Sequence, residues 1–151
     1  MSIREKRLNN EYKELSQLVR DSGGRLNIVS TKGKPVEVYI IEYRCRGIEG
    51  LQSNKPVYRN THKVKITLGN NYPTETAKVK FITNIFHPNV YKNKDVCLGN
   101  DSKMPENLCE LVIRIGKIIQ YSKDVLNLNS PAHPQACNWA KNHMQLFPVD
   151  T

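Results

Sequence analysis

Two short stretches of the sequence alternate strictly between apolar and polar residues. In the first stretch, Val64, Ile66 and Leu68 alternate with Lys63, Lys65 and Thr67. In the second stretch, Ala77, Val79 and Phe81 alternate with Lys78 and Lys80. A period of two is the spacing of side chains on one face of a β-strand. The pattern therefore predicts two neighbouring strands that bury one face and expose lysines on the other.

Two further segments have strand character. Between Val36 and Cys45 the chain is rich in β-branched and aromatic residues, and apolar side chains occupy both alternating sets of positions, which is typical of a central strand. A shorter strand is expected near Leu26 to Ser30. Because the connections are short, the segments predict a four-stranded antiparallel meander.

A helix is predicted before the strands. Ser2 and Glu5 have the spacing of a capping box. Apolar residues then recur at helical spacing as far as Arg20, and Gly23-Gly24 ends the helix.

Two helices are predicted after the strands. Asn107 and Glu110 form a second capping-box pattern. The apolar stripe that follows consists of Leu108, Leu111, Val112, Ile115, Ile118 and Ile119. Ser130-Pro131 is the expected entry to a last helix. Its inward-facing residues are expected to be Ala136, Ala140 and Met144.

The order of these elements predicts one α+β domain over residues 1–151, in which helices cover one face of a sheet. No apolar run approaches the ~20 residues that a membrane-spanning helix requires. The charged first residues lack the apolar segment of a signal peptide. We therefore expect a cytoplasmic protein with no membrane partner.

The net charge of +9 favours an acidic partner. Nucleic acid is one such partner, but the sequence has no nucleic-acid-binding motif and only 7% aromatic residues, so that reading rests on charge alone. The four cysteines form no C-x-x-C pair, and we expect neither a metal site nor a bound cofactor.

The segment from Thr83 to Glu106 has no sustained periodicity, and long loops of this kind are usually functional. It contains His87-Pro88-Asn89, and Cys97 follows Asn89 by eight residues. Together with the order of the predicted elements, this motif and interval resemble the core of the ubiquitin-conjugating enzymes. The resemblance extends over nearly the whole chain.

The resemblance implies that Cys97 carries the C-terminus of a ubiquitin-like modifier as a thioester and transfers it to an amine, expected to be a lysine. A thiolate is the form of cysteine that accepts the acyl group. Asn89 would either donate a hydrogen bond to the oxyanion or order the loop. His87 and Pro88 would hold the loop.

One departure from the family concerns the acidic residue that many members place before the last helix, where it orients the acceptor amine. His133 occupies this position here. It could accept the amine proton or serve only at the start of the helix. Asp101 and Glu106 are alternative acidic groups.

The resemblance also implies partners: the modifier, an activating enzyme and a protein target. In the family the first helix docks on the activating enzyme, so Arg4, Arg7 and Lys13 are candidate contacts. Binding of a ligase stays open, because Thr74 replaces the aromatic residue that usually follows Tyr-Pro. The lysines of the sheet either bind a second modifier or form a solvated face.

These departures suggest a divergent family member, such as those of bacterial conjugation operons. Two alternative functions stay open. One is a non-catalytic module of the same fold that binds a ubiquitin-like protein, and the other is a cysteine hydrolase built from Cys97, His87 and Asn89.

Overall fold

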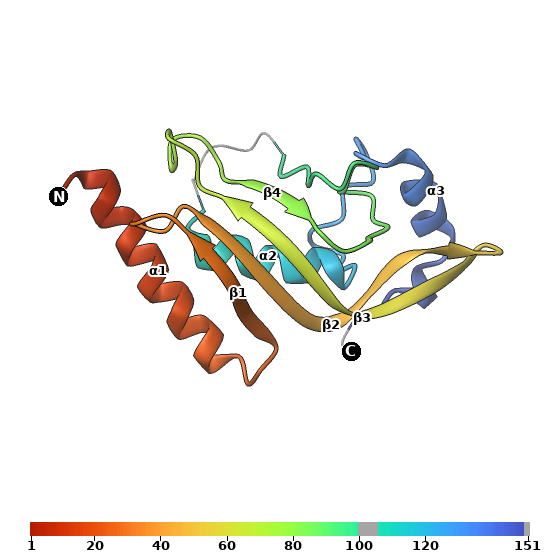
Figure 1. Ribbon diagram of the computed structural model, residues 1–151. Coiled ribbons are helices and arrows are strands. Elements are labelled where there is room, and N and C mark those ends of the chain that lie inside the picture. The colour runs from red at the N-terminus through yellow and green to blue at the C-terminus, as the bar shows by residue number, and fades with distance from the viewer. Residues whose placement is uncertain (100–105, 150–151) are drawn as a thin grey trace.

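The computed structural model describes residues 1–99 and 106–149 (Figure 1). The elements in chain order are α1 (Ile3–Asp21), β1 (Leu26–Lys32), β2 (Val38–Gln52), β3 (Lys55–Thr67), β4 (Lys78–Phe81), α2 (Leu108–Ile119), α3 (Pro134–Asn142) and a 3-10 helix, η1 (Met144–Leu146). The strands form one antiparallel sheet in the order β1-β2-β3-β4. The predicted α+β class and the four-stranded meander are confirmed.

The register between β3 and β4 explains the alternation in the sequence. Lys65 pairs with Lys80 on the outer face, whereas Val64 pairs with Phe81 and Ile66 with Val79 on the inner face. All four of these apolar residues are buried. Each strand therefore presents its apolar set to the helices and its lysines to solvent.

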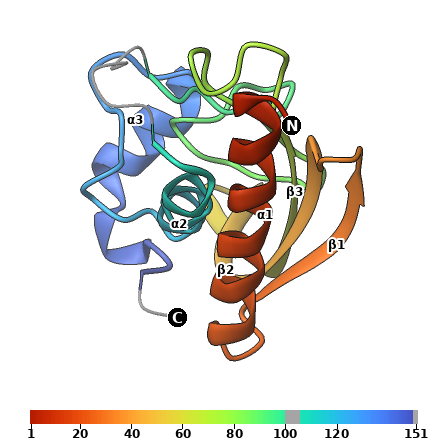
Figure 2. The ribbon, with the colours of Figure 1, turned by 90° about the vertical axis from the view of Figure 1, so that its left-hand side faces the viewer.

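α1 and α2 lie on the inner side of the sheet (Figure 2). All six residues of the predicted α2 stripe are buried, and both predicted capping boxes, at Ser2 and Asn107, are formed. The main core lies between the sheet, α1 and α2. It includes Leu8, Leu15, Tyr39, Ile41, Val64, Ile66, Leu111 and Ile115. Within residues 1–99 and 106–149, no helix has the length and apolar character needed to cross a bilayer.

The hairpin of β2 and β3 is longer than predicted. β2 begins at Val38 and continues past Cys45 to Gln52, and the turn at Ser53 and Asn54 has φ values of 51° and 64°. Gly47 interrupts the apolar pattern of the strand. Glycine is needed at this position because a Cβ atom there would lie 2.7 Å from Ile119 Cγ2 and 2.8 Å from His62 Nε2. A close approach of helix and sheet thus requires glycine within a strand.

The predicted entry to the last helix is wrong. Ser130 belongs instead to a turn in which Asn127 Nδ2 donates to the Ser130 carbonyl at 2.7 Å and Ser130 N donates to Asn127 Oδ1 at 3.0 Å. α3 begins four residues after Ser130, at Pro134, with His133 as the N-cap. Met144 was expected to face inward but is 43% exposed, because α3 ends at Asn142 and Met144 begins η1.

A second, smaller core lies beneath the long loop. It consists of Ile48, Phe86, Tyr121, Ala136, Trp139 and Ala140. The far end of the β2–β3 hairpin contacts this region, since Trp139 Nε1 donates to the Asn54 carbonyl at 3.1 Å. The second core therefore supports the loop that contains the predicted chemistry.

Candidate functional site

The backbone of the His87-Pro88-Asn89 segment binds two parts of the chain that are distant in sequence. The Pro88 carbonyl accepts hydrogen bonds from Ala132 N at 2.9 Å and His133 N at 3.1 Å. The Asn89 carbonyl accepts one from Cys97 N at 2.8 Å. The carbonyl groups of two adjacent residues, Pro88 and Asn89, therefore bind the backbone of His133 and of the candidate nucleophile Cys97. The predicted site residues Cys97, Asn89 and His133 come together through this segment.

The Asn89 side chain orders a third segment. Asn89 is only 6% exposed. Its Nδ2 donates to the Val125 carbonyl at 2.7 Å, and its Oδ1 accepts from Asn127 N at 2.9 Å. Both ends of the amide thus contact backbone groups, which is the geometry of a loop-ordering residue. Nδ2 carries two N–H groups, and the hydrogen bond to the Val125 carbonyl uses one of them.

His87 is fully buried and neutral. Its Nδ1 accepts a hydrogen bond from Asn89 N at 2.9 Å, and its ring centroid lies 4.5 Å from that of Tyr121. Burial lowers the pKa of His87 to about 3. Within the described residues its Nε2 has no hydrogen-bond partner. An imidazole in this environment is poorly suited to act as a base, and its contacts are those of a residue that holds the loop.

Cys97 is half-buried, at the end of the segment that pairs with β4 and the motif. The Cys97 side chain lies beside the hydroxyl group of Tyr91, a residue that is 46% exposed, and this neighbour raises the pKa of Tyr91. The thiol therefore lies beside a solvent-exposed side chain and is not sealed inside either core.

The other three cysteines have surroundings typical of packing residues. Burial raises the pKa of Cys45 to about 11 and also raises the pKa of Cys109. Cys137 is buried in α3, and its thiol donates to the Leu128 carbonyl at 3.4 Å. A raised pKa disfavours the thiolate, so Cys45 and Cys109 are poor nucleophiles at neutral pH.

His133 caps α3. Its Nδ1 accepts a hydrogen bond from Ala136 N at 3.1 Å, and its ring packs edge-on against Phe86 at 5.1 Å. Burial, followed by the charge of Lys92, lowers the pKa of His133. The geometry is that of the helix-start role, with one ring nitrogen committed to the cap.

Of the two alternative acidic groups, only Glu106 belongs to the described residues. Glu106 forms an ion pair with Arg114 at 2.7 Å, so its carboxylate is already engaged. Asp101 lies outside the described residues.

Two of the three candidate contacts for an activating enzyme are bound within the chain. Arg4 donates to the Gly69 carbonyl at 2.8 Å and pairs with Glu37 at 3.3 Å. Arg7 lies 3.7 Å from Glu11 and over the ring of Tyr72. Lys13 is exposed. Arg4 and Arg7 therefore tie α1 to the rest of the fold, and Lys13 faces solvent.

Sequence reasoning missed the buried carboxylate of Glu11. Glu11 is 3% exposed; it accepts hydrogen bonds from Leu108 N at 3.0 Å and from the Tyr72 hydroxyl. It thereby joins α1, the Tyr-Pro segment and the N-terminus of α2, where a negative charge is favourable. The sequence does contain a sign of this burial. Glu11 lies at helical spacing between Leu8 and Leu15, so an acidic residue falls within an apolar stripe.

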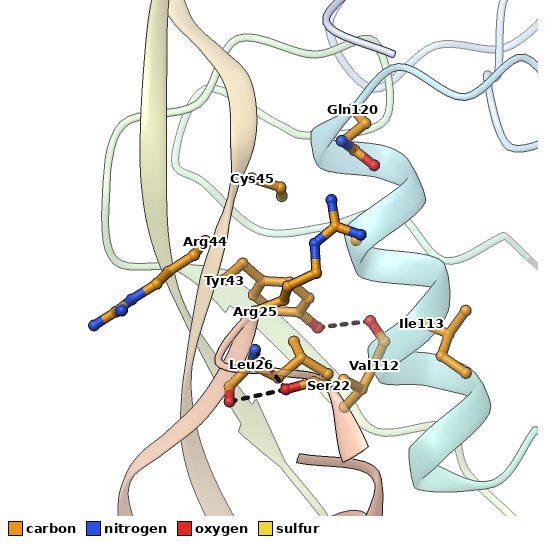
Figure 3. A pocket seen from close by; sticks show the side chains of 10 residues that line it. Ser22, Arg25, Leu26, Tyr43, Arg44, Cys45, Val112, Ile113 and Gln120 are labelled. Carbon is orange, nitrogen blue, oxygen red and sulfur yellow. Dashed lines mark hydrogen bonds between the residues drawn. The ribbon is translucent and has the colours of Figure 1, made fainter. Parts of the chain in front are cut away.

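A separate hollow of about 340 Å³ opens between β2, α2 and the α1–β1 turn (Figure 3). The ring of Tyr43 lines it, and the Tyr43 hydroxyl donates to the Val112 carbonyl at 2.7 Å. The Arg44 side chain points away from it (Figure 3). None of the predicted catalytic residues lines this hollow. In the part of the chain that the structure describes, no group of three or more histidine, cysteine or acidic side chains could hold a metal ion.

Comparison with known proteins agrees with this geometry. The family model described as ubiquitin-conjugating enzyme matches residues 7–148. A relative from Candida albicans, ubiquitin-conjugating enzyme E2 2, is 30% identical over 98 residues, which is 63% of this chain and 52% of that protein. A relative from Branchiostoma floridae, ubiquitin-conjugating enzyme E2 S, is 34% identical over 88 residues, which is 56% of this chain and 41% of that protein. These matches thus span about half or less of the relatives' length. Because the family model covers nearly the whole chain, the protein belongs to the ubiquitin-conjugating enzyme family.

Proposed function

We propose that this chain carries the C-terminus of a ubiquitin-like modifier as a thioester on Cys97 and transfers it to an amine of a protein target. Family membership supports this reaction class. The observation that carries the proposal is the position of Cys97. Its backbone is fixed to the Asn89 carbonyl at 2.8 Å, while its thiol is half-buried beside an exposed tyrosine.

Two acyl transfers make up the reaction. In the first, the Cys97 thiolate attacks the thioester that links the modifier to an activating enzyme, and the thiolate of that enzyme leaves. In the second, a neutral amine attacks the new thioester, the carbon–sulfur bond breaks, and the Cys97 thiolate is released as the amine loses its proton. ATP is consumed by the activating enzyme, so this chain requires no cofactor of its own.

The second transfer develops negative charge on the carbonyl oxygen. The remaining N–H of Asn89 Nδ2 is the donor that we assign to it, in addition to the role of this side chain in ordering residues 125–127. A donor held in place by a second hydrogen bond needs little reorganisation during the reaction.

For the activating enzyme we propose α1 as the docking element, with Lys13 and the neighbouring exposed Lys6 as the cationic contacts. Arg4 and Arg7 contribute by fixing the helix, since their guanidinium groups are engaged with Gly69, Glu37 and Glu11.

The test is a thioester assay with ubiquitin as the probe. The chain is incubated with ubiquitin, a ubiquitin-activating enzyme and ATP, and the products are separated without reductant. We expect an adduct that dithiothreitol cleaves, that Cys97→Ala abolishes, and that Cys109→Ala retains. An adduct retained in Cys97→Ala would contradict the assignment of the nucleophile. If ubiquitin gives no adduct, the assay is repeated with other ubiquitin-like proteins and their activating enzymes; absence of every adduct would contradict the proposal.

A further inference from the structure

The two flanks of Cys97 are held in different ways. On the N-terminal side, Val96 N donates to the Val79 carbonyl at 2.9 Å and Cys97 N donates to the Asn89 carbonyl at 2.8 Å. These backbone bonds attach the residues before the thiol to β4 and to the motif.

On the C-terminal side, a side chain from α2 takes this role. Arg114 Nη1 donates to the Leu98 carbonyl at 3.1 Å. Among the described residues, this is the hydrogen bond that the Leu98 carbonyl accepts. Gly99 follows with φ of 79°, so the chain turns directly after this contact.

The same guanidinium group binds a second point of the chain. Arg114 Nη2 lies 2.7 Å from Glu106 Oε1. The side chains of Arg114 and Glu106 are only 32% and 27% exposed, so solvent screens this pair less than a surface pair. A planar guanidinium can donate to a carbonyl and a carboxylate at once, which a lysine ammonium does with less geometric definition.

The geometry points to Arg114 as a positioning residue for the transfer reaction. It fixes the peptide that follows Cys97, and the Glu106 carboxylate fixes Arg114 in turn. This inference rests on the proposed function, because it concerns the alignment of a thioester on Cys97. Arg114 lies on α2, so the helix that closes the main core also orients the reacting residue.

The experiment separates the contact with Leu98 from the ion pair. Glu106→Gln removes the ion pair and keeps the donor to Leu98, so it serves as the reference. The double variant Glu106→Gln/Arg114→Met removes the donor as well without leaving an unpaired carboxylate. Glu106→Gln/Arg114→Lys tests rescue by a shorter donor of the same charge.

Two readouts are compared in the three variants. The first is discharge of a preformed ubiquitin thioester to free lysine, together with the KM of each variant in the loading reaction. The second is alkylation of Cys97 by iodoacetamide, followed by peptide mass spectrometry, which requires no modifier.

For the double variant with methionine we expect discharge ~5 to 10-fold slower than for the reference, with an unchanged KM for loading, since a misaligned reacting group reduces rate more than binding. Alkylation should become ~3-fold faster, because a loosened flank gives the reagent more approaches to the thiol. The lysine variant should recover part of the discharge rate. A merely structural role would not move the two readouts in opposite directions.

Equal discharge and equal alkylation in the methionine variant and the reference would overturn the inference. Slower discharge without any change in alkylation, or with no recovery in the lysine variant, would also overturn it. If no thioester forms even on the parent chain, the proposed function fails, and an unchanged alkylation rate then decides separately against the role of Arg114.

Discussion

The main core and the second core are built from different kinds of side chain. The main core is aliphatic and aromatic, and its members recur at the spacings of strands and helices. Half of the buried residues of the second core are aromatic, and buried polar groups lie beside it: His87, Asn89 and His133, all less than 9% exposed. Apolar packing therefore sets the frame, whereas hydrogen bonds to buried polar side chains shape the candidate site.

The two cores are therefore expected to differ in how pH changes and substitutions affect their stability. A buried polar group is stabilising only while its partners and its charge state are intact. A purely apolar site instead loses stability in proportion to the volume removed.

The largest expected effect is loss of stability in mild acid. Burial lowers the pKa of His62 to about 4 and the pKa of His87 to about 3. In the unfolded chain both groups titrate near ~6.5, so the unfolded state binds more protons below that pH, and stability is lost as the pH falls towards the folded-state values. Between pH 7 and pH 5 we expect a loss of ~4 kcal/mol from the two residues together.

Urea unfolding at the two pH values measures this loss. In His62→Gln about half of the pH dependence should disappear. Equal unfolding midpoints at pH 7 and pH 5 for the parent chain would show that neither histidine is buried in its neutral form.

The next effect is a cavity in the main core. Ile115 is fully buried on α2, and Ile115→Ala should lower the free energy of unfolding by ~3 kcal/mol. Ile113→Ala on the same helix is the matched control, because Ile113 is 48% exposed; it should lower stability by less than ~1 kcal/mol. Similar losses in both variants would contradict the described packing of α2.

A smaller effect is expected from the polar side. Asn89→Ala leaves the Val125 carbonyl and Asn127 N without their partner, which should lower the free energy of unfolding by ~2 kcal/mol. Asn10→Ala, a substitution of an exposed asparagine on α1, is the control. If Asn89→Ala unfolds at the same urea concentration as the parent, the amide does not order residues 125–127.

The smallest effect concerns the acceptor amine. Asp and Asn both cap helices well, so His133→Asp and His133→Asn should keep α3 equally stable. A carboxylate at this position can orient a lysine and favour loss of its proton, and we expect His133→Asp to discharge to free lysine ~10-fold faster than His133→Asn. Equal rates would indicate that residue 133 does not face the acceptor.

Most of the helices and strands could be predicted from the sequence because their apolar and polar residues recur at regular spacing. Both capping boxes, the α2 stripe and the lysine alternation on β3 and β4 correspond to observed elements. The far end of the β2–β3 hairpin was missed because Gly47, Gly50 and two residues with positive φ, Ser53 and Asn54, interrupt the strand pattern. The sequence does not report that His62 and Ile119 fill the space beside Gly47.

The candidate site was predictable as a set of residues but not as an arrangement. The spacing of the motif and Cys97 selected the loop from the sequence, whereas the partners of Asn89 lie 36 and 38 residues away in sequence. The start of α3 was misplaced because Ser130-Pro131 and His133-Pro134 both fit a helix entry, and only the Asn127 turn decides between them.

The central claim is that one sulfur atom, that of Cys97, forms the bond to the modifier. Replacing it by a hydroxyl tests this most directly, since an oxyester resists dithiothreitol and is cleaved by hydroxide. With ubiquitin, a ubiquitin-activating enzyme and ATP, we expect Cys97→Ser to give an adduct stable to reductant, mapped by peptide mass spectrometry to residue 97. A reductant-sensitive adduct that persists in Cys97→Ser and maps to Cys45, Cys109 or Cys137 would contradict the account.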